Sequence, residues 1–414
     1  MSENSKEPNA SGDHKISRRL LLGGAATAAI VLVQTSVGKM VQAAVPESLY
    51  IPADPTKVIG AGPSGYGSRS LFEHPERLPS ATSSRTPLQD LYGTITPSGL
   101  HFERHHGGVP IIDPEKYELL IHGMVDKPLV FTLAALKRFP SVTRTCFIEC
   151  SGNFRSGKET MTPQQICGLT SQSEWTGVML STIFREAGIK PKASWFLAEG
   201  GDAAVMTRSI PLSKGWDDAM IVYAQNGEAI RPEQGYPARL LLPGWEGNTC
   251  IKWIRRIEIA DAPFMTREET SKYTEPVKGK IRQFSFVMDA RSIITFPAYP
   301  VQIERGWVEI RGIAWSGRGK IVRVEVSVNG GRTWVPAELQ GPILDKAHTA
   351  FKYLWLWQGT ETEIMSRAVD ETGYTQPTYD ELVAARDSRS GYHFNPITVW
   401  SVQRNGKILS RSDS

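Results

Sequence analysis

The sequence has few cysteines, and their spacing excludes two common cofactor sites. Its 414 residues include four cysteines, with no Cys-x-x-Cys pair and none followed by histidine. A zinc ribbon and a c-type haem attachment site both need such spacings, so this chain carries neither and any haem must lie on another chain. Cys146 and Cys150 are too far apart along an extended strand to form a disulfide. A disulfide between Cys167 and Cys250 is not excluded by the sequence.

A strong charge of one sign is also missing. The formal net charge is +4, and residues 1–43 hold five Lys/Arg and three Asp/Glu, which leaves +2 on the rest. This balance gives no reason to expect a nucleic-acid partner. The length and the 40% hydrophobic composition predict two or three domains with a substantial core.

No apolar run is long enough to cross a membrane. The longest one near the N-terminus, residues 20–33, falls short of the roughly 20 residues that a spanning helix needs. It follows Arg18-Arg19 and precedes Val41-Gln42-Ala43, a small-residue cleavage site. Residues 1–43 therefore indicate a twin-arginine signal peptide, and we expect a periplasmic protein without a membrane span after cleavage; a membrane anchor is the weaker alternative.

Residues 44–96 are rich in Pro, Gly and Ser, and we expect an extended arm wrapped on the body of the protein. Gly60-Ala-Gly62-Pro-Ser-Gly65 has the G-x-G-x-x-G spacing of a dinucleotide site. The preceding apolar run is only Val58-Ile59, and Pro and Gly follow where a helix is required. A turn-rich arm is therefore the preferred interpretation.

The remaining chain predicts an α+β fold. Between His101 and about Ala260, apolar runs alternate with loops and with short helical patterns at 133–139 and 180–187, without a regular βαβ cadence. From about Gly306 the pattern changes to seven or so short strands, with a hairpin signal at Asn329-Gly330-Gly331. We expect a mixed α/β domain at 97–275 and an immunoglobulin-like β-sandwich at 276–410.

One segment stands out for chemistry. Residues 144–155 form a β-branched and aromatic run that ends at Cys150 and continues into a polar turn with Gly152. Arg144 and Arg155 flank this thiol and would favour the thiolate, the form that binds metals. The alternative is that Cys150 is a small buried hydrophobe.

A second polar segment is His101-Phe-Glu-Arg104-His105-His106. On a helix, His101 and His105 could hold zinc, but no third ligand is visible. The preferred interpretation is that Arg104 and His106 bind oxyanions, because a guanidinium offers a planar fork of donors and an imidazole adds another.

Cys150-Ser-Gly-Asn153-Phe-Arg155 resembles the Cys-Ala-Gly-Asn-Arg-Arg segment of the sulfite oxidase family, whose cysteine binds the molybdenum of a molybdopterin cofactor. The resemblance implies that Cys150 is a metal ligand, that Asn153 contacts the cofactor and that Arg155 faces the substrate. Arg104-His105-His106-x-x-x-Pro110 is similar to the family's Arg-Asn-His-x-x-x-Pro, which implies a substrate-facing Arg104 and a pterin-facing His106.

Three further segments follow in the family's order. Tyr223-Ala-Gln-Asn-Gly resembles Tyr-Glu-Met-Asn-Gly, which would make Tyr223 the active-site tyrosine. Gln234-Gly-Tyr-Pro-Ala-Arg239 resembles His-Gly-Phe-Pro-x-Arg, so Arg239 would contact the pterin and Gln234 replaces a histidine. Lys252 stands in the loop that ends Lys-Trp, and it would contact a phosphate or the pterin. The resemblance covers about residues 100–403, and it is closest in the SoxC branch.

That resemblance implies a molybdopterin enzyme that oxidises sulfite, or sulfane sulfur on a carrier protein, by oxygen-atom transfer at molybdenum. It also implies a separate SoxD-like c-type cytochrome subunit as electron acceptor, and a homodimer or heterotetramer formed through the sandwich. Two rivals stay open: an exported binding protein for a sulfur oxyanion, and a molybdenum sulfoxide reductase of the same family.

Overall fold

Strands dominate the chain, and short helices cover parts of them. The computed structural model describes residues 59–386 and 391–411, and the account below concerns the unit Gly62–Ser414. The predicted signal peptide (1–43) and the first part of the predicted arm (44–58) lie outside the described residues. In the part of the chain that is described, no helix is long and apolar enough to cross a membrane.

The arm leads into a small antiparallel sheet. Its strands pair in the order β1 (Leu78–Pro79), β2 (Ser83–Arg85) and β3 (Glu103–Arg104), and Ser83 lies opposite Arg104. The 3₁₀ turns η1 (Leu88–Asp90) and η2 (Ser98–Leu100) connect β2 to β3. The arm therefore places a strand directly beside Arg104. No helix follows Gly65 among residues 66–75, so a dinucleotide site does not form there.

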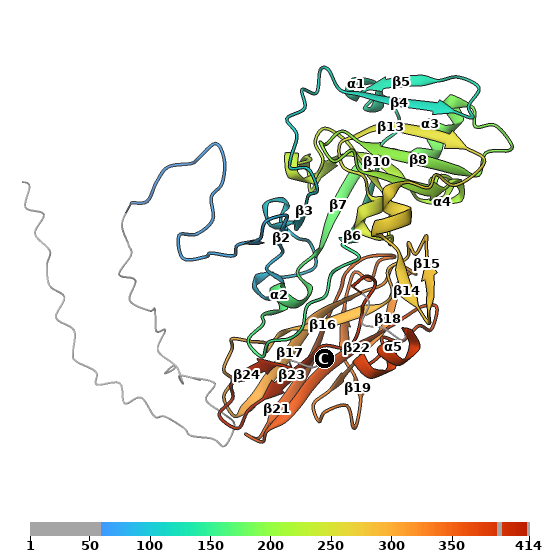
Figure 1. Cartoon of the computed structure of the whole chain (residues 1–414). Helices are drawn as coiled ribbons and strands as arrows, with labels where there is room; N and C mark the ends of the chain where they lie inside the picture. The colour runs from blue at the N-terminus through green and yellow to red at the C-terminus, as the bar shows by residue number, and fades with distance from the viewer. Residues whose placement is uncertain (1–58, 387–390, 412–414) are drawn as a thin grey trace, which may run out of the picture. The chain divides into compact units, whose positions relative to one another are not determined.

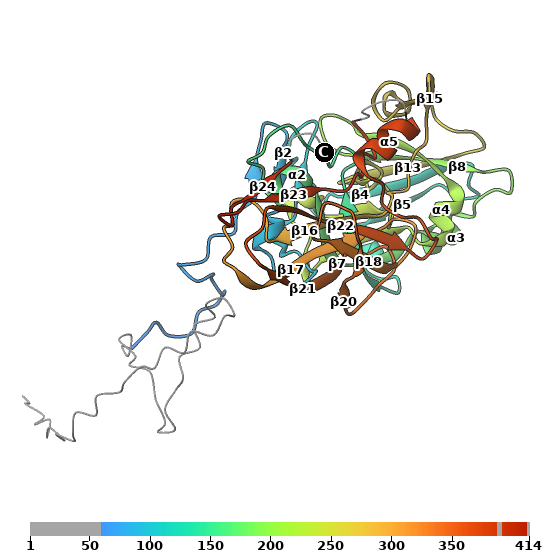
Figure 2. The same cartoon turned by 90° about the horizontal axis from the view of Figure 1, so that it is seen from below.

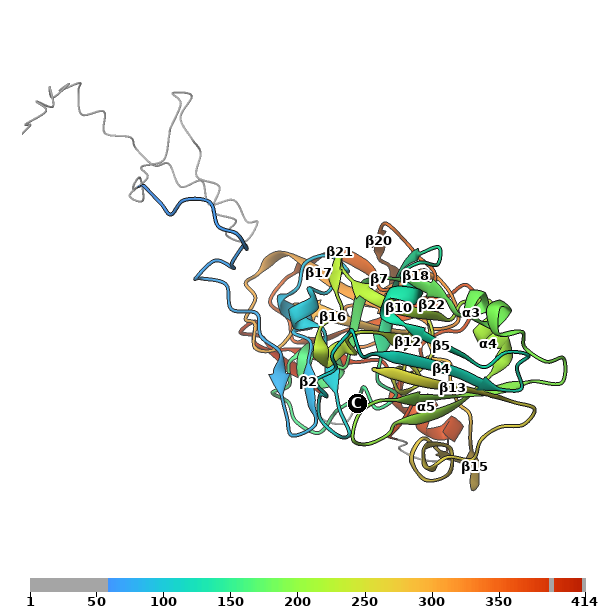
Figure 3. The ribbon, with the colours of Figure 1, turned by 90° about the horizontal axis from the view of Figure 1, so that it is seen from above.

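Two five-stranded sheets make up the first domain. One has the order β11-β10-β7-β6 with β12 also on β10, and its bounds are β6 (Val142–Glu149), β7 (Thr170–Met179), β10 (Met220–Gln225), β11 (Glu228–Ala229) and β12 (Arg239–Leu241). The other has the order β5-β4-β13-β8-β9, and its bounds are β4 (Glu118–Gly123), β5 (Leu129–Thr132), β8 (Trp195–Gly200), β9 (Thr207–Pro211) and β13 (Ile254–Ala260). Figure 3 shows β5, β4 and β13 side by side. Within these sheets β4 and β13 are parallel and the other pairs are antiparallel, so the βαβ cadence is absent as expected.

Local capping signals set the ends of the short helices. Thr132 Oγ1 accepts from Ala135 N at the start of α1 (Leu133–Leu136), and Thr162 and Gln165 form a capping box on α2 (Pro163–Cys167). Helix α3 (Leu180–Ala187) ends at Gly188, whose φ of 68° favours glycine. Other short elements are α4 (Leu212–Asp217), η3 (Pro232–Gln234), η4 (Gly247–Thr249) and the π-type turn η5 (Glu268–Lys272).

The C-terminal part is a two-sheet sandwich, as predicted. One sheet has the order β16-β17-β21-β20: β16 (Arg291–Phe296), β17 (Gly306–Trp315), β20 (Glu338–Gln340) and β21 (Thr349–Trp357). The other has the order β19-β18-β22-β23-β24: β18 (Ile321–Ser327), β19 (Val335–Pro336), β22 (Thr362–Asp370), β23 (Val399–Val402) and β24 (Ile408–Ser410). Figure 2 shows strands of both sheets together with α5 (Tyr379–Arg386), and the hairpin β14 (Glu275–Val277) and β15 (Lys280–Arg282) precedes the sandwich.

Strand β6 lies between the two hydrophobic cores (Figure 1). Because side chains alternate along a strand, Cys146 and Ile148 join the core of the first domain while Phe147 joins the core of the sandwich. Both faces of β6 are therefore fixed at the point where the strand delivers Cys150.

The predicted α+β class with a terminal sandwich is confirmed, and the helix at 180–187 has the expected bounds. One local expectation needs correction. The helix expected at 133–139 ends at Leu136.

Candidate functional site

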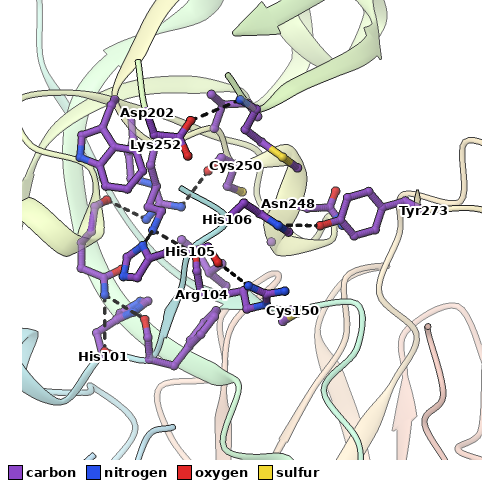
Figure 4. Close-up of a pocket in the computed structure, with 18 residues that line it drawn as sticks. His101, Arg104, His105, His106, Cys150, Asp202, Asn248, Cys250, Lys252 and Tyr273 are labelled. Carbon is purple, nitrogen blue, oxygen red and sulfur yellow. Dashed lines mark hydrogen bonds between the residues drawn. The ribbon is translucent and has the colours of Figure 1, made fainter. Parts of the chain in front are cut away.

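A solvent-open cavity of about 690 Å³ lies beside the end of β6 (Figure 4). It gathers six of the nine predicted site residues: Arg104, His106, Cys150, Gln234, Arg239 and Lys252. The remaining wall consists of His101, Phe102, His105, Ile148, Asp202, Met206, Gly247, Asn248, Cys250, Ile251, Trp253 and Tyr273. Asn153, Arg155 and Tyr223 do not line it.

Cys150 is held at the first position of a turn. Its amide donates to Leu169 O at 3.0 Å, and its carbonyl accepts from Asn153 N at 2.9 Å. All four thiols of the chain are free, so the Cys167–Cys250 disulfide does not form. Cys150 therefore presents an unmodified thiol to the cavity.

The cation beside this thiol is Arg104, which Figure 4 shows next to Cys150. Burial raises the pKa of the Cys150 thiol, and Arg104 lowers it in opposition. The expectation that Arg144 and Arg155 would favour the thiolate is wrong. Arg144 instead pairs with Asp345 at 2.8 Å, because it lies farther back on β6.

Arg155 also lies outside the cavity where it was expected. Its side chain is exposed and borders a separate small pocket with Lys158 and Ser410. The physical reason is the turn after Cys150: Arg155 N donates to Ile166 O at 3.1 Å, which directs this residue toward α2.

Asn153 does not line the cavity, and its side chain bonds to the protein instead. Its Nδ2 donates to Glu149 Oε1 at 3.0 Å, and its Oδ1 accepts from Leu169 N at 2.8 Å. With both ends of the amide bonded to the protein, Asn153 closes the turn that carries Cys150.

The tyrosine that lines the cavity is Tyr273, whereas Tyr223 was expected there. Tyr223 lies at an irregularity of β10, and Lys137 Nζ lies 5.7 Å from its ring. Tyr273 follows η5, and its hydroxyl lies 3.2 Å from His106 Nε2. Burial, and Arg104 next, lower the pKa of His106, so this imidazole is neutral near pH 7. The sequence around Tyr273 has a charged composition without an apolar pattern, so nothing local signalled its place.

Gln234 and Arg239 form the buried floor. Gln234 Nε2 donates to Phe102 O at 2.8 Å, and Arg239 donates to Gln234 O and Cys250 O, each at 2.9 Å. Burial lowers the pKa of Arg239 to about 10, so the guanidinium is charged at neutral pH. Its Nε has no hydrogen-bond partner among the described residues.

A buried carboxylate directly before Cys150 ties this site to the sandwich. Glu149 accepts from Arg291 Nη1 at 2.9 Å and from Trp315 Nε1 at 2.6 Å, besides Asn153. Arg291 also donates to Asn153 O. The turn at Cys150 is therefore fixed by groups from both domains.

A second buried network supports Asn248, which also lines the cavity and whose Nδ2 donates to Ser151 Oγ at 3.2 Å. Glu246 accepts from Arg208 Nη1 and from Asn248 Nδ2, each at 2.8 Å, and lies 3.3 Å from His393 Nε2. Burial alone would raise the pKa of Glu246, but Arg208 and His393 hold it below its usual value. A buried acidic group thus lies behind Asn248 on the cavity wall.

Two family models match the chain in succession. Residues 106–268 match the oxidoreductase molybdopterin binding domain, and residues 282–397 match the Mo-co oxidoreductase dimerisation domain.

Sulfite oxidases and nitrate reductases are among the curated relatives. The chain is 30% identical over 315 residues to sulfite oxidase of Gallus gallus, with 68% of this chain and 68% of that protein covered. It is 30% identical over 349 residues to an NADH nitrate reductase of Ulva prolifera, with 71% of this chain but 39% of that protein covered. The chain therefore spans about two fifths of the length of that reductase.

A solved structure is similar over nearly its whole length. The sulfane dehydrogenase SoxCD from Paracoccus pantotrophus matches with a TM-score of 0.84 and 43% identity, covering 88% of this chain and 99% of that chain.

The cavity fits the cofactor that these matches imply. No cluster of three or more His, Cys, Asp or Glu in the described ranges could hold a metal by itself, whereas a pterin-held metal needs only one protein thiol. Buried polar atoms of the wall, His101 Nε2, Arg239 Nε and Asn248 Oδ1, lack partners among the described residues and suit a polar ligand. The chain belongs to the sulfite oxidase family of molybdopterin oxidoreductases.

Proposed function

We propose that this protein oxidises a reduced sulfur compound, either sulfite or sulfane sulfur on a carrier protein, by oxygen-atom transfer at molybdenum. The observation that carries this proposal is the Cys150 thiol beside the Arg104 guanidinium in one cavity, in a chain 43% identical to a sulfane dehydrogenase. Electrons would leave to a separate c-type cytochrome subunit of the SoxD type.

The chain's own residues have distinct tasks in this reaction. Cys150 would hold the metal of the cofactor through a soft thiolate, and the bound cofactor would supply oxygen-atom transfer and two-electron redox chemistry. Arg104 offers a planar fork of donors and would hold an anionic sulfur group next to Cys150. His106 is neutral and can accept a proton from water in the cavity.

The floor and wall would hold the cofactor itself. Arg239 offers a charged guanidinium whose Nε–H has no hydrogen-bond partner among the described residues. The side-chain amide of Gln234 already donates to Phe102 O. The amino group of Lys252 contacts the protein, because its Nζ lies within hydrogen-bond distance of Arg104 O, Glu233 O and His105 Nδ1. Lys252 also lines the cavity, and its contact with a phosphate or the pterin stays a prediction.

The test is activity per molybdenum. The chain is produced in a host that makes the cofactor, and cytochrome reduction is measured with sulfite and with thiosulfate, with and without a SoxD-type subunit. Nitrate serves as the control substrate, because nitrate reductases are among the relatives. Turnover of a sulfur compound supports the proposal, whereas nitrate reduction without sulfur oxidation, or oxyanion binding without molybdenum, would contradict it.

We also propose that residues 276–410 make the subunit contact. The outer face of β17 and β21 presents Trp307 opposite Leu356, with side chains 46% and 43% exposed, and Leu354 at 59%. Contiguous exposed apolar residues of this kind mark interaction surfaces.

We propose in addition that the protein is delivered to the periplasm by the twin-arginine route. This proposal rests on Arg18-Arg19 and the short apolar run after them.

A further inference from the structure

His105 departs from the family's motif, which has asparagine at this position, and the proposed function gives it no task. Its imidazole lies between two charged side chains. Nε2 is 2.7 Å from Glu103 Oε2, and Nδ1 is 2.7 Å from Lys252 Nζ. Arg77 of the arm pairs with Glu103 on the outer side. Figure 4 shows His105 beside Lys252 at the cavity.

The carboxylate fixes which nitrogen of the ring carries the proton. Glu103 can only accept when ionised, so His105 must donate from Nε2. In the neutral ring this leaves the Nδ1 lone pair to accept from the Lys252 ammonium. The hydrogen bond from His105, followed by Arg77, lowers the pKa of Glu103 against the effect of burial, so the carboxylate is ionised at neutral pH.

Lys252 connects His105 to the backbone of Arg104. Its ammonium donates to Arg104 O at 3.2 Å and to Glu233 O at 3.1 Å, besides His105. Arg104 Nη1 in turn donates to His105 O. The carbonyl of Arg104 is thus held by Lys252, and its guanidinium is held by the carbonyl of His105.

We propose that Glu103, His105 and Lys252 form a hydrogen-bonded chain that positions the Arg104 guanidinium for an oxyanion. Glu103 and His105 are positioning residues in this chain. Neither needs to touch the substrate.

The surroundings of Lys252 also explain why a polar partner is needed beside it. Burial and the neighbouring Arg239 both lower the pKa of Lys252, and Glu103 opposes this effect. Without an acceptor at Nδ1, the ammonium would lose one of its three partners in a wall that already contains Arg104 and Arg239. An asparagine could replace the ring, because its amide has both a donor and an acceptor, whereas an apolar side chain has neither.

Three variants test this chain: His105→Asn, His105→Leu and Glu103→Gln. His122→Leu is the matched control, because His122 on β4 lies 3.9 Å from the carboxylate of Glu258 and does not line the cavity. On the molybdenum-loaded chain, calorimetry gives the dissociation constant of sulfate, and steady-state assays give KM and kcat per molybdenum for sulfite. The sulfate measurement does not depend on the proposed function, on which the turnover assay rests.

His105→Leu should raise the sulfate dissociation constant and the sulfite KM by roughly 10- to 100-fold, the factor for a lost hydrogen bond to a charged group. Glu103→Gln should have a smaller effect in the same direction. His105→Asn should remain within about threefold of wild type, because its amide keeps both bonds.

An unchanged sulfate dissociation constant in His105→Leu, with a lower unfolding temperature alone, would overturn the inference, as would an effect of equal size in His122→Leu. A wild-type chain that binds no sulfate would overturn it too. Wild type that binds sulfate but oxidises no sulfur compound would contradict only the proposed function.

Discussion

Glu149→Gln is expected to destabilise the protein and to disturb the site at the same time. Glu149 and Arg291 form an ion pair at 2.9 Å with side chains only 1% and 4% exposed. Removing one member of such a pair leaves the other charge buried, which costs about 3–5 kcal/mol. Asn153 and Trp315 would also lose a charged acceptor. We expect a loss of roughly 3 kcal/mol or more in unfolding free energy by denaturant titration, together with a lower molybdenum content.

Two further variants separate the charge from the contact. Glu149→Gln/Arg291→Met removes both charges and should recover much of the stability, because a buried pair is often replaceable by apolar groups. Asp345→Asn breaks the Arg144–Asp345 pair, whose side chains are 28% and 36% exposed, and should cost only about 0–1 kcal/mol. A cost in Glu149→Gln no larger than that in Asp345→Asn, with full molybdenum content, would refute this reasoning.

Three other outcomes are expected. Glu246 raises the pKa of His393 against burial, so the stability from His393 is full below about pH 6.5 and is lost as pH rises through the higher folded-state pKa. Denaturant titrations of His393→Gln between pH 6 and 9 should lack this decline, and an unchanged slope would contradict the assignment. Trp307→Lys/Leu356→Lys should convert an oligomer to a monomer by light scattering, and an unaltered mass would exclude this face as the contact. Arg18→Lys/Arg19→Lys should leave the protein uncleaved in the cytoplasm; fractionation that finds it in the periplasm would count against the export proposal.

Local physical signals explain what the sequence could predict. The strand before Cys150, the helix that ends at Gly188 and the sandwich strands all follow from periodicity and turn residues within about ten positions. The gathering of Arg104, Cys150, Arg239 and Lys252 in one cavity needed the motif order as well, because these residues come from separate elements.

The errors came from contacts between distant segments. Arg155 follows Cys150 closely, yet a backbone bond to Ile166 directs it away. Tyr223 occupies a strand whose register places it beside Lys137, whereas Tyr273 reaches the cavity from an irregular turn. Closeness in the sequence does not tell which side of a turn faces a cavity. Predicting whether these residues line the cavity therefore needed the three-dimensional fold.

Cys150→Ser tests the central claim most directly. Molybdenum per chain and sulfite- or thiosulfate-dependent cytochrome reduction are measured for this variant, with Cys146→Ser and Cys167→Ser as controls that lie in the cores away from the cavity. If Cys150 holds the metal, a hydroxyl in place of the soft thiolate should remove most of the turnover while the fold survives, and the controls should retain activity. Full activity in Cys150→Ser, or a wild-type chain that contains no molybdenum when produced in a host that makes the cofactor, would contradict the account.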